Sequence, residues 1–210
     1  MEHTRIPEAE IELFKQLSSL KVIFDVGART DIDYLEIWPE SEHHLFEPHP
    51  KFFEVLKEKV GNKPNVFLNN FGLGDRNEER GYHDNLQSFV GSWILSDGDA
   101  RDRLLPLRNT ASYINEHEIN QIDFFKIDTE GFELKVLLGL IHHFGIIRFL
   151  QYEHSGKHNN DCIKGLLHDN FEIYDVGYRN SFCISKSLVH EGERDRLAKY
   201  IRDNNLSQLA

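Results

Sequence analysis

The chain alternates short apolar runs with longer amphipathic segments. Residues 21–26 form a nearly continuous apolar run that ends at Gly27, which is typical of a strand buried on both faces of a parallel sheet. Residues 51–60 instead repeat apolar positions at helical spacing, and Gly61 follows as a stop signal. The same reasoning predicts strands at 21–26, 44–47, 65–71, 122–127, 146–152, 171–176 and 181–185, and helices at 7–20, 51–60, 110–120, 133–144, 161–169 and 192–204.

This order of elements predicts one α/β domain over residues 1–210, with an open sheet, right-handed crossovers and helices on both faces. Only residues 177–180 separate the last two strands, too few for a crossover helix, so these strands should form an antiparallel hairpin. Residues 1–20 form a helical lead-in and 190–210 a C-terminal helix. Residues 72–107, with scattered glycines and charges, fit the pattern least; we expect an irregular insertion or an extra ribbon there.

Composition narrows the possible partners. The 210 residues carry 24 Lys and Arg against 35 Asp and Glu, a formal net charge of −11, so no general basic field exists to attract nucleic acid or an anionic membrane. The two cysteines, Cys162 and Cys183, form no metal or disulfide motif, and no apolar run is long enough to span a bilayer. We therefore expect a soluble, cytoplasmic protein; the sequence indicates no particular oligomeric state.

The loop after the first strand carries acidic chemistry. Residues 25–31 read DVGARTD, with one glycine where a dinucleotide fingerprint needs three. A pyrophosphate would be repelled by Asp25 and Asp31, whereas a cationic nucleoside such as S-adenosylmethionine would not. Glu47 ends the second strand twenty residues past Gly27, where a carboxylate accepts hydrogen bonds from ribose hydroxyls. These features favour S-adenosylmethionine over NAD.

Four sequence blocks resemble the FkbM-type family of class I S-adenosylmethionine-dependent methyltransferases: residues 22–28 (VIFDVGA), 45–50 (LFEPHP), 70–75 (NFGLGD) and 123–133 (DFFKIDTEGFE). The resemblance implies a Rossmann-like, seven-stranded, mostly parallel sheet with an antiparallel terminal hairpin. It also implies a methionine site at 25–29, a ribose site at Glu47 and an adenine site near 71–75. The cofactor-binding residues expected on this basis and from strand position are Asp25, Gly27, Ala28, Arg29, Glu47, Pro48, Phe71, Gly72, Leu73, Asp75 and Asp128. This chain departs from its relatives at Arg29-Thr30-Asp31, where they commonly carry further glycines.

Methyl transfer to a hydroxyl requires alignment of the acceptor and removal of a proton. Asp128 and Glu130 follow the fourth strand, and His154 follows the fifth; we predict these three as catalytic residues. Asp128 could be the base, a cofactor anchor or an acceptor-positioning group. Glu133 more simply pairs with a helix dipole. Asp128, Glu130, Glu153 and His154 could together ligate a divalent cation, but we do not expect a metal site.

The resemblance suggests hydroxyls of secondary metabolites or of surface polysaccharide sugars as acceptors, and hence O-methylation. The acceptor pocket should draw on residues 72–107, where His83, Ser88, Ser92 and Trp93 offer an aromatic ring and hydroxyls. A non-catalytic module that binds S-adenosylmethionine, or that serves in assembly, is the alternative suggested by the altered first loop. An NAD-dependent oxidoreductase is disfavoured by the acidic first loop.

Overall fold

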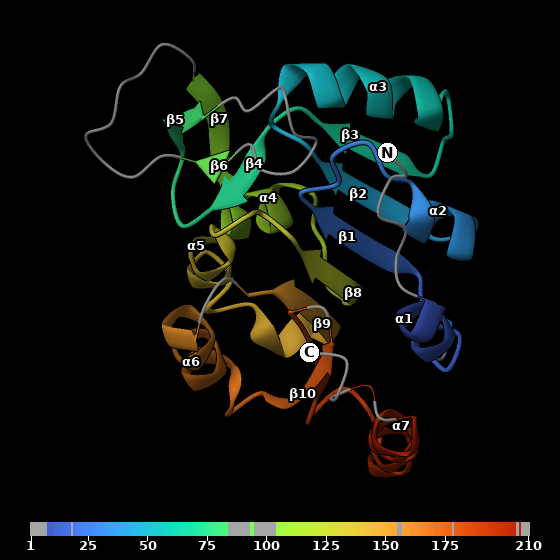
Figure 1. The fold of residues 1–210 in the computed structure, drawn as a ribbon. Coiled ribbons are helices and arrows are strands. Elements are labelled where there is room, and N and C mark those ends of the chain that lie inside the picture. Colours follow the sequence, from blue (N-terminus) through green and yellow to red (C-terminus); the bar gives the residue numbers. More distant parts are fainter. Residues whose placement is uncertain are drawn as a thin grey trace.

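The computed structural model describes residues 8–17, 19–83, 93–94, 104–154, 157–177, 179–204 and 206. A seven-stranded sheet with the order β10-β11-β9-β8-β1-β2-β3 forms its centre (Figure 1). The strands are parallel except β11, which runs antiparallel to both β9 and β10, so the expected sheet and terminal hairpin are confirmed. The strands are β1 (Val22–Val26), β2 (Glu42–Phe46), β3 (Val66–Asn69), β8 (Ile122–Ile127), β9 (Ile147–Glu153), β10 (Phe171–Gly177) and β11 (Asn180–Ser185).

The central strands β1 and β8 are apolar on both sides because helices cover both faces of the sheet. Phe24 and Phe125 are register partners on one face, with ring centroids 5.3 Å apart. On the opposite face Phe124 packs edge-on against Phe14 of the N-terminal helix, also at 5.3 Å. A near-continuous apolar run is what this two-sided burial requires.

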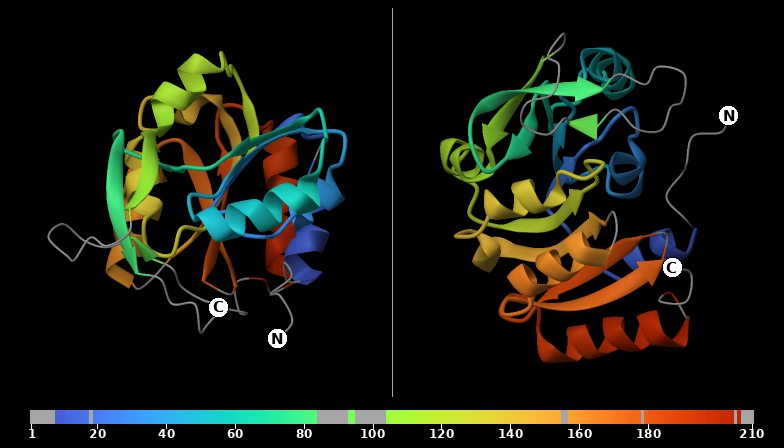
Figure 2. Two further views of the ribbon diagram at one scale, coloured as in Figure 1. Left: turned by 90° about the horizontal axis from the view of Figure 1, so that it is seen from above. Right: turned by 60° about the vertical axis from the view of Figure 1, so that its left-hand side comes forward.

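The helices divide between the two faces (Figures 1 and 2). One face carries α4 (Thr110–Glu116), α5 (Glu133–Leu138) and α6 (Lys157–Leu167); the other carries α1 (Glu8–Phe14), α2 (Asp33–Ile37), α3 (Pro50–Val60) and α7 (Glu191–Asp203). The short helix α2 escaped prediction because its five residues offer little periodicity. The longest described helix, α7, has 13 residues, and none of the described helices is both long and apolar enough to cross a lipid bilayer.

Helix α5 is shorter than the predicted 133–144. It ends at Gly139, after which turns and a short 3-10 helix (Phe144–Ile146) lead into β9. A Cβ atom at Gly139 would lie 2.2 Å from the carbonyl oxygen of Gly74, so this position allows β4 to approach the end of the helix closely.

The described parts of residues 72–107 are ordered strands. β4 (Gly72–Gly74), β5 (Glu78–His83), β6 (Trp93–Ile94) and β7 (Leu104–Asn109) form a second sheet with the order β4-β7-β5-β6. These strands form an extra ribbon, one of the two expected possibilities, while the prediction of an irregular insertion over residues 72–107 as a whole stays a prediction. Ser88 and Ser92 lie outside the described residues, as do the side chains of His83 and Trp93, so their role at the acceptor pocket stays a prediction.

Candidate active site

The first loop, which follows β1, packs closely against the end of β8. The amides of Gly27 and Ala28 donate to the carbonyl oxygen of Phe46, at 3.0 and 3.1 Å. Gly27 has φ +89°, and a Cβ atom there would lie 1.9 Å from the carbonyl oxygen of Asp128. Only glycine combines this backbone conformation with so close an approach. The predicted residues 25–28 and Asp128 therefore meet at one edge of the sheet.

Glu47 holds the far side of this loop. Its carboxylate accepts hydrogen bonds from the backbone N–H of Arg29 at 2.8 Å and of His49 at 2.7 Å. The side chain is buried, and burial raises the pKa of Glu47 to about 7 despite these two bonds. Each carboxylate oxygen keeps a second lone pair for a ligand hydroxyl. The predicted ribose residue thus also fixes the shape of the first loop.

Arg29 takes the place where relatives are expected to carry glycine, and it adopts the backbone conformation that glycine favours. Its φ is +54°, and its guanidinium lies 5.4 Å from the ring centroid of Phe52. A left-handed conformation costs a non-glycine residue about 1–2 kcal/mol. Arg29 therefore adopts this conformation itself, and its contacts with Glu47 and Phe52 offset the strain.

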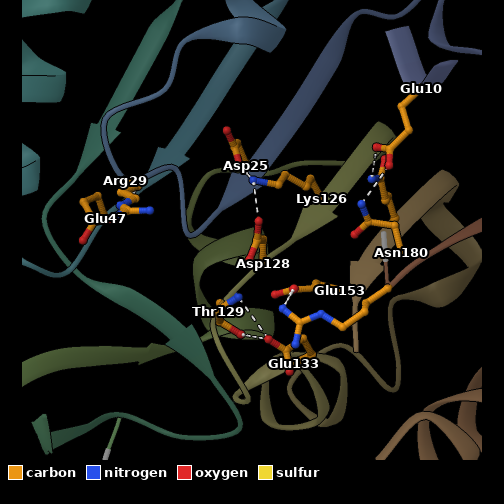
Figure 3. Close-up of polar contacts among 12 residues, drawn as sticks. Glu10, Asp25, Arg29, Glu47, Lys126, Asp128, Thr129, Glu133, Glu153 and Asn180 are labelled. Carbon is orange, nitrogen blue, oxygen red and sulfur yellow. Dashed lines mark hydrogen bonds and ion pairs between the residues drawn. The ribbon is translucent and has the colours of Figure 1, made fainter. Parts of the chain in front are cut away.

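An ion triad lies beneath the loop, with Asp25 buried, Lys126 partly buried and the Asp128 side chain 40% exposed (Figure 3). Lys126 Nζ is 3.3 Å from Asp25 Oδ1 and 3.4 Å from Asp128 Oδ2. Burial alone would lower the pKa of Lys126, but Asp25 and Asp128 outweigh it and raise the pKa well above its ordinary value. Burial also raises the pKa of Asp25, although Lys126 opposes this. Lys126 was not predicted as a site residue. A lysine within the apolar run 122–127 could have indicated it, because a charged side chain in a buried strand needs a partner.

Three carboxylates, here called the acidic group, lie together at the ends of β8 and β9: Asp128, Glu130 and Glu153. Oxygen atoms of Asp128, Glu130 and Glu153 all lie within 4.8 Å of one another. Burial, with Asp128 as the next contributor, raises the pKa of Glu153 to about 8, and the same two causes raise the pKa of Glu130. Arg179 forms an ion pair with Glu153. Asp128 and Glu130 therefore come together as predicted, and the third member is Glu153.

His154 lies on the other side of the sheet from this acidic group. Gln151 is the register partner of Lys126, so Glu153, two residues later, shares the face of Lys126, while His154 shares the face of Tyr152. The rings of Tyr152 and His154 lie 6.3 Å apart, and burial lowers the pKa of His154. Among the predicted catalytic residues, His154 is the one that the fold separates from Asp128.

Glu133 locks the turn that carries Glu130. Its Oε1 atom accepts hydrogen bonds from the Thr129 amide, the Thr129 hydroxyl and the Gly131 amide, at 3.0, 3.0 and 2.9 Å. Glu130 and Gly131 both have positive φ, +55° and +108°. Glu133 is 1% exposed. Its main contacts are thus with the turn, a more specific role than the helix-dipole pairing expected from sequence.

In the region expected to bind adenine, some side chains remain accessible, whereas others are buried or already paired within the protein. Phe71 is half-buried, with the guanidinium of Arg108 5.0 Å from its ring centroid. Asn70, which the sequence analysis did not single out, donates to the carbonyl oxygen of Glu47 at 3.0 Å. Gly72 and Leu73 are buried in β4, and the carboxylate of Asp75 forms ion pairs with Lys135 and Arg76, at 3.1 and 3.2 Å. Pro48 and Phe71 therefore remain the surfaces best placed to contact a base.

The acidic group also has the spacing of a divalent-cation site, but the described residues add no fourth Asp, Glu, His or Cys to it. Acidic side chains at such spacing are common without a metal ion. The prediction that the site holds no metal therefore stays a prediction.

The N-terminal helix contributes a buried carboxylate next to this edge. Glu10 accepts hydrogen bonds from the side-chain amides of Gln151 and Asn180, both at 2.8 Å. Figure 3 shows Glu10 reaching down from α1 toward Asn180, beyond Lys126. Glu10 is 2% exposed, and burial raises its pKa. Helix α1 is thereby tied to both β9 and β11.

Comparison with known proteins agrees with this arrangement. The model of the methyltransferase FkbM domain matches residues 25–179, more than half of the chain. The 2-O-methyltransferase NoeI of Sinorhizobium fredii is 23% identical, over 74% of each chain. Solved structures with a similar fold include monomeric WbdD, at 8% identity and TM-score 0.50, covering 87% of this chain and 42% of that one. Precorrin-6y C5,15-methyltransferase of Geobacter metallireducens has 11% identity and TM-score 0.48, covering 87% and 88%.

The match by the family model spans the first loop, Glu47, the Asp25–Lys126–Asp128 triad and the acidic group. The chain belongs to the FkbM family of methyltransferases, which makes S-adenosylmethionine its methyl donor.

Proposed function

We propose that the chain methylates a hydroxyl oxygen of a sugar, either in a polysaccharide or smaller glycan, or of a secondary metabolite. The observation that carries the proposal is the group of three carboxylates beside the first loop, with Asp128 and Glu153 partly buried and Glu130 exposed. A hydroxyl is a weak nucleophile until its proton leaves, so a carboxylate whose pKa lies near neutrality suits an oxygen acceptor. The name of the relative NoeI, a 2-O-methyltransferase, supports the same reaction class.

The residues present fit S-adenosylmethionine. Gly27 leaves open backbone at the loop where a side chain would collide with Asp128, and Glu47 has spare lone pairs for ribose hydroxyls. Asp25, Lys126 and Asp128 together carry one net negative charge, which favours a cationic methionine end over a pyrophosphate. When bound, the cofactor supplies a methyl group on a positively charged sulfur.

Each group of this chain then has a definite task. The first loop and Glu47 would hold the nucleoside, and Pro48 and Phe71 are the residues that would contact its base. Asp128 lies between the first loop and the acidic group, where it can orient the reacting partners. The acidic group binds the acceptor hydroxyl and receives its proton. Orientation of this kind can supply several kcal/mol of the barrier reduction.

Calorimetry and mass spectrometry test the proposal in two stages. S-Adenosylmethionine and its demethylated product should both bind to the purified chain, and Glu47→Ala should weaken both at least tenfold. Methyl transfer from deuterium-labelled cofactor is then measured on a panel of methyl glycosides, oligosaccharides and phenolic alcohols. Absence of binding at millimolar ligand contradicts the proposal, as does cofactor binding without methyl transfer to any hydroxyl of the panel.

The non-catalytic alternative rests on Arg29, which occupies a glycine-type position in the loop. It requires tight cofactor binding with no methyl transfer to any member of the panel, and binding unchanged by Asp128→Asn. Because Arg29 preserves the hydrogen bond to Glu47, we favour the catalytic function.

A further inference from the structure

The acidic group is placed where an acceptor would meet the cofactor. Glu153 ends β9, the neighbour of β8, and its carboxylate lies with those of Asp128 and Glu130 within 4.8 Å. The strand alternation that puts Glu153 on the face of Lys126 and Asp128 puts His154 on the opposite face. The end of β9 therefore offers Glu153, rather than His154, to the reacting side.

The local backbone is strained around this group. Among the described residues, the non-glycine positions with positive φ are Arg29, Glu118, Glu130 and Arg179. Three of these four border the site: Arg29 in the first loop, Glu130 in the acidic group and Arg179 paired with Glu153. Strain of this kind persists where the surrounding structure over-determines a conformation, and it clusters at active sites.

We propose that Glu153 accepts the proton of the acceptor hydroxyl; this rests on the proposed O-methyl transfer. The bond from the acceptor oxygen to the methyl carbon forms as the carbon–sulfur bond breaks. The electron pair of that bond stays on sulfur, which becomes a neutral thioether, and the hydroxyl proton passes to the Glu153 carboxylate. The proton leaves to solvent after the product dissociates, so charge and atoms balance.

The charged groups facing Glu153 explain how it is kept ready for this step. Asp128 of β8 and Glu130 of the following turn disfavour its ionised form, while Arg179 of the β10–β11 turn favours it. A bound cationic cofactor would add a second positive charge to this region and shift the balance toward the Glu153 carboxylate. The base is thus charged when the methyl donor is present, and retains its proton more often when the site is empty or holds the neutral product.

This coupling can be measured without any acceptor. Calorimetric titration at pH 7.5 in two buffers of different ionisation enthalpy gives the protons released on binding. S-Adenosylmethionine should release roughly half a proton more than its demethylated product, because a pKa near 8 falls below the working pH. In Glu153→Gln this difference should vanish, while in the exposed control Glu191→Gln it should persist.

The outcomes separate the two proposals. A difference that persists in Glu153→Gln, or that is absent from the wild type, overturns the role of Glu153 and leaves the O-methyltransferase assignment standing. Failure of both ligands to bind contradicts the proposed function itself. If Glu153→Gln does not fold by circular dichroism, Glu153→Asp replaces it; a shorter carboxylate should change the released fraction without abolishing it.

Turnover on an acceptor from the panel supplies the second readout. Glu153→Gln should lower kcat at least 100-fold, the range expected for a general base, while the Kd of the demethylated cofactor stays within about threefold. The wild-type kcat/KM for the cofactor should rise with pH through about 8, the pKa of Glu153 in the free protein, whereas kcat at saturating cofactor should level off at lower pH. The variant should lose both pH dependences. A comparable loss in His154→Asn with activity retained in Glu153→Gln would overturn the proposal, as would inactivation by a chelator reversed by Mg²⁺.

Discussion

Lys126 of β8 and Asp25 of β1 are register partners, and their side chains form an ion pair of 3.3 Å beneath the first loop. The pair neutralises a carboxylate that is only 3% exposed. Asp25 therefore does not act on a ligand as an isolated negative charge. The acidic character that a cationic cofactor meets comes from Asp128 and the residues beyond it.

Replacing Lys126 by methionine should destabilise the fold by about 3 kcal/mol at pH 7, because Asp25 is left buried without its cation. The loss should shrink as the pH falls, since Asp25 can then bind a proton. Denaturant unfolding at pH 7 and pH 5 measures both effects. Adding Asp25→Asn should recover part of the stability; a double variant no more stable than Lys126→Met would show that the ion pair is not the cause.

Cofactor affinity should depend on the ionisation of Glu47. Its pKa is raised to about 7 in the free protein by burial, and ribose hydroxyls hydrogen-bond best to the carboxylate form. Binding of the demethylated cofactor should therefore weaken as the pH falls below 7, by up to about tenfold per unit. Calorimetry from pH 5.5 to 8.5 measures the profile. Glu47→Gln should bind more weakly with a flatter profile, and a slope unchanged in this variant would assign the dependence to another group.

Gly27→Ala should abolish cofactor binding and cost more than 2 kcal/mol of stability. The added Cβ would lie 1.9 Å from the carbonyl oxygen of Asp128, so the first loop and β8 cannot keep their approach. Gly61→Ala is the matched control, because Gly61 also has positive φ, +62°, but its Cβ would meet nothing within 4 Å. The control should lose only about 1 kcal/mol. Thermal unfolding and calorimetry compare the two; equal losses would mean that backbone conformation alone matters.

Glu133→Gln should loosen the turn that carries Glu130. An amide oxygen accepts the three hydrogen bonds of Oε1 less strongly than a carboxylate does, so we expect a stability loss of about 1–3 kcal/mol. Hydrogen exchange at the amides of Thr129 and Gly131 should accelerate. Lys135→Gln, two residues further along α5, serves as a comparison, since it removes only a half-exposed ion pair with Asp75. Unchanged exchange in Glu133→Gln would exclude a locking role.

The sheet was predictable because its strands are buried on both faces, which leaves a clear apolar signal at 21–26 and 122–127. The end of α5 was not, because the pattern continues past Gly139 and only the approach of Gly74 explains the break. Residues 72–107 gave no clear signal because the described strands there are short, and in β7 the exposed positions Leu104 and Pro106 are as apolar as the buried Leu105 and Leu107.

The candidate site was predictable where strand position decides, as for Gly27, Glu47 and Asp128. The candidate site was not predictable where the relative positions of side chains on different strands decide which residues meet. The register of β8 against β9 decides that Glu153 and not His154 shares the face of Asp128, and no spacing within either strand reveals that register. Lys126 was overlooked for the same reason, since its partner Asp25 lies on another strand.

The family match begins at Asp25, yet the hydrogen bonds of Glu10 reach from α1 to β9 and β11. Removing α1, which precedes the shared region, would uncover Gln151, the register partner of Lys126, and would remove the Glu10 carboxylate that accepts from both side-chain amides. Water would then enter beside the ion triad. Helix α1 lies outside the region that the family model matches, yet it shields the ion triad from water. The part of the chain that this site needs therefore begins before the family match does.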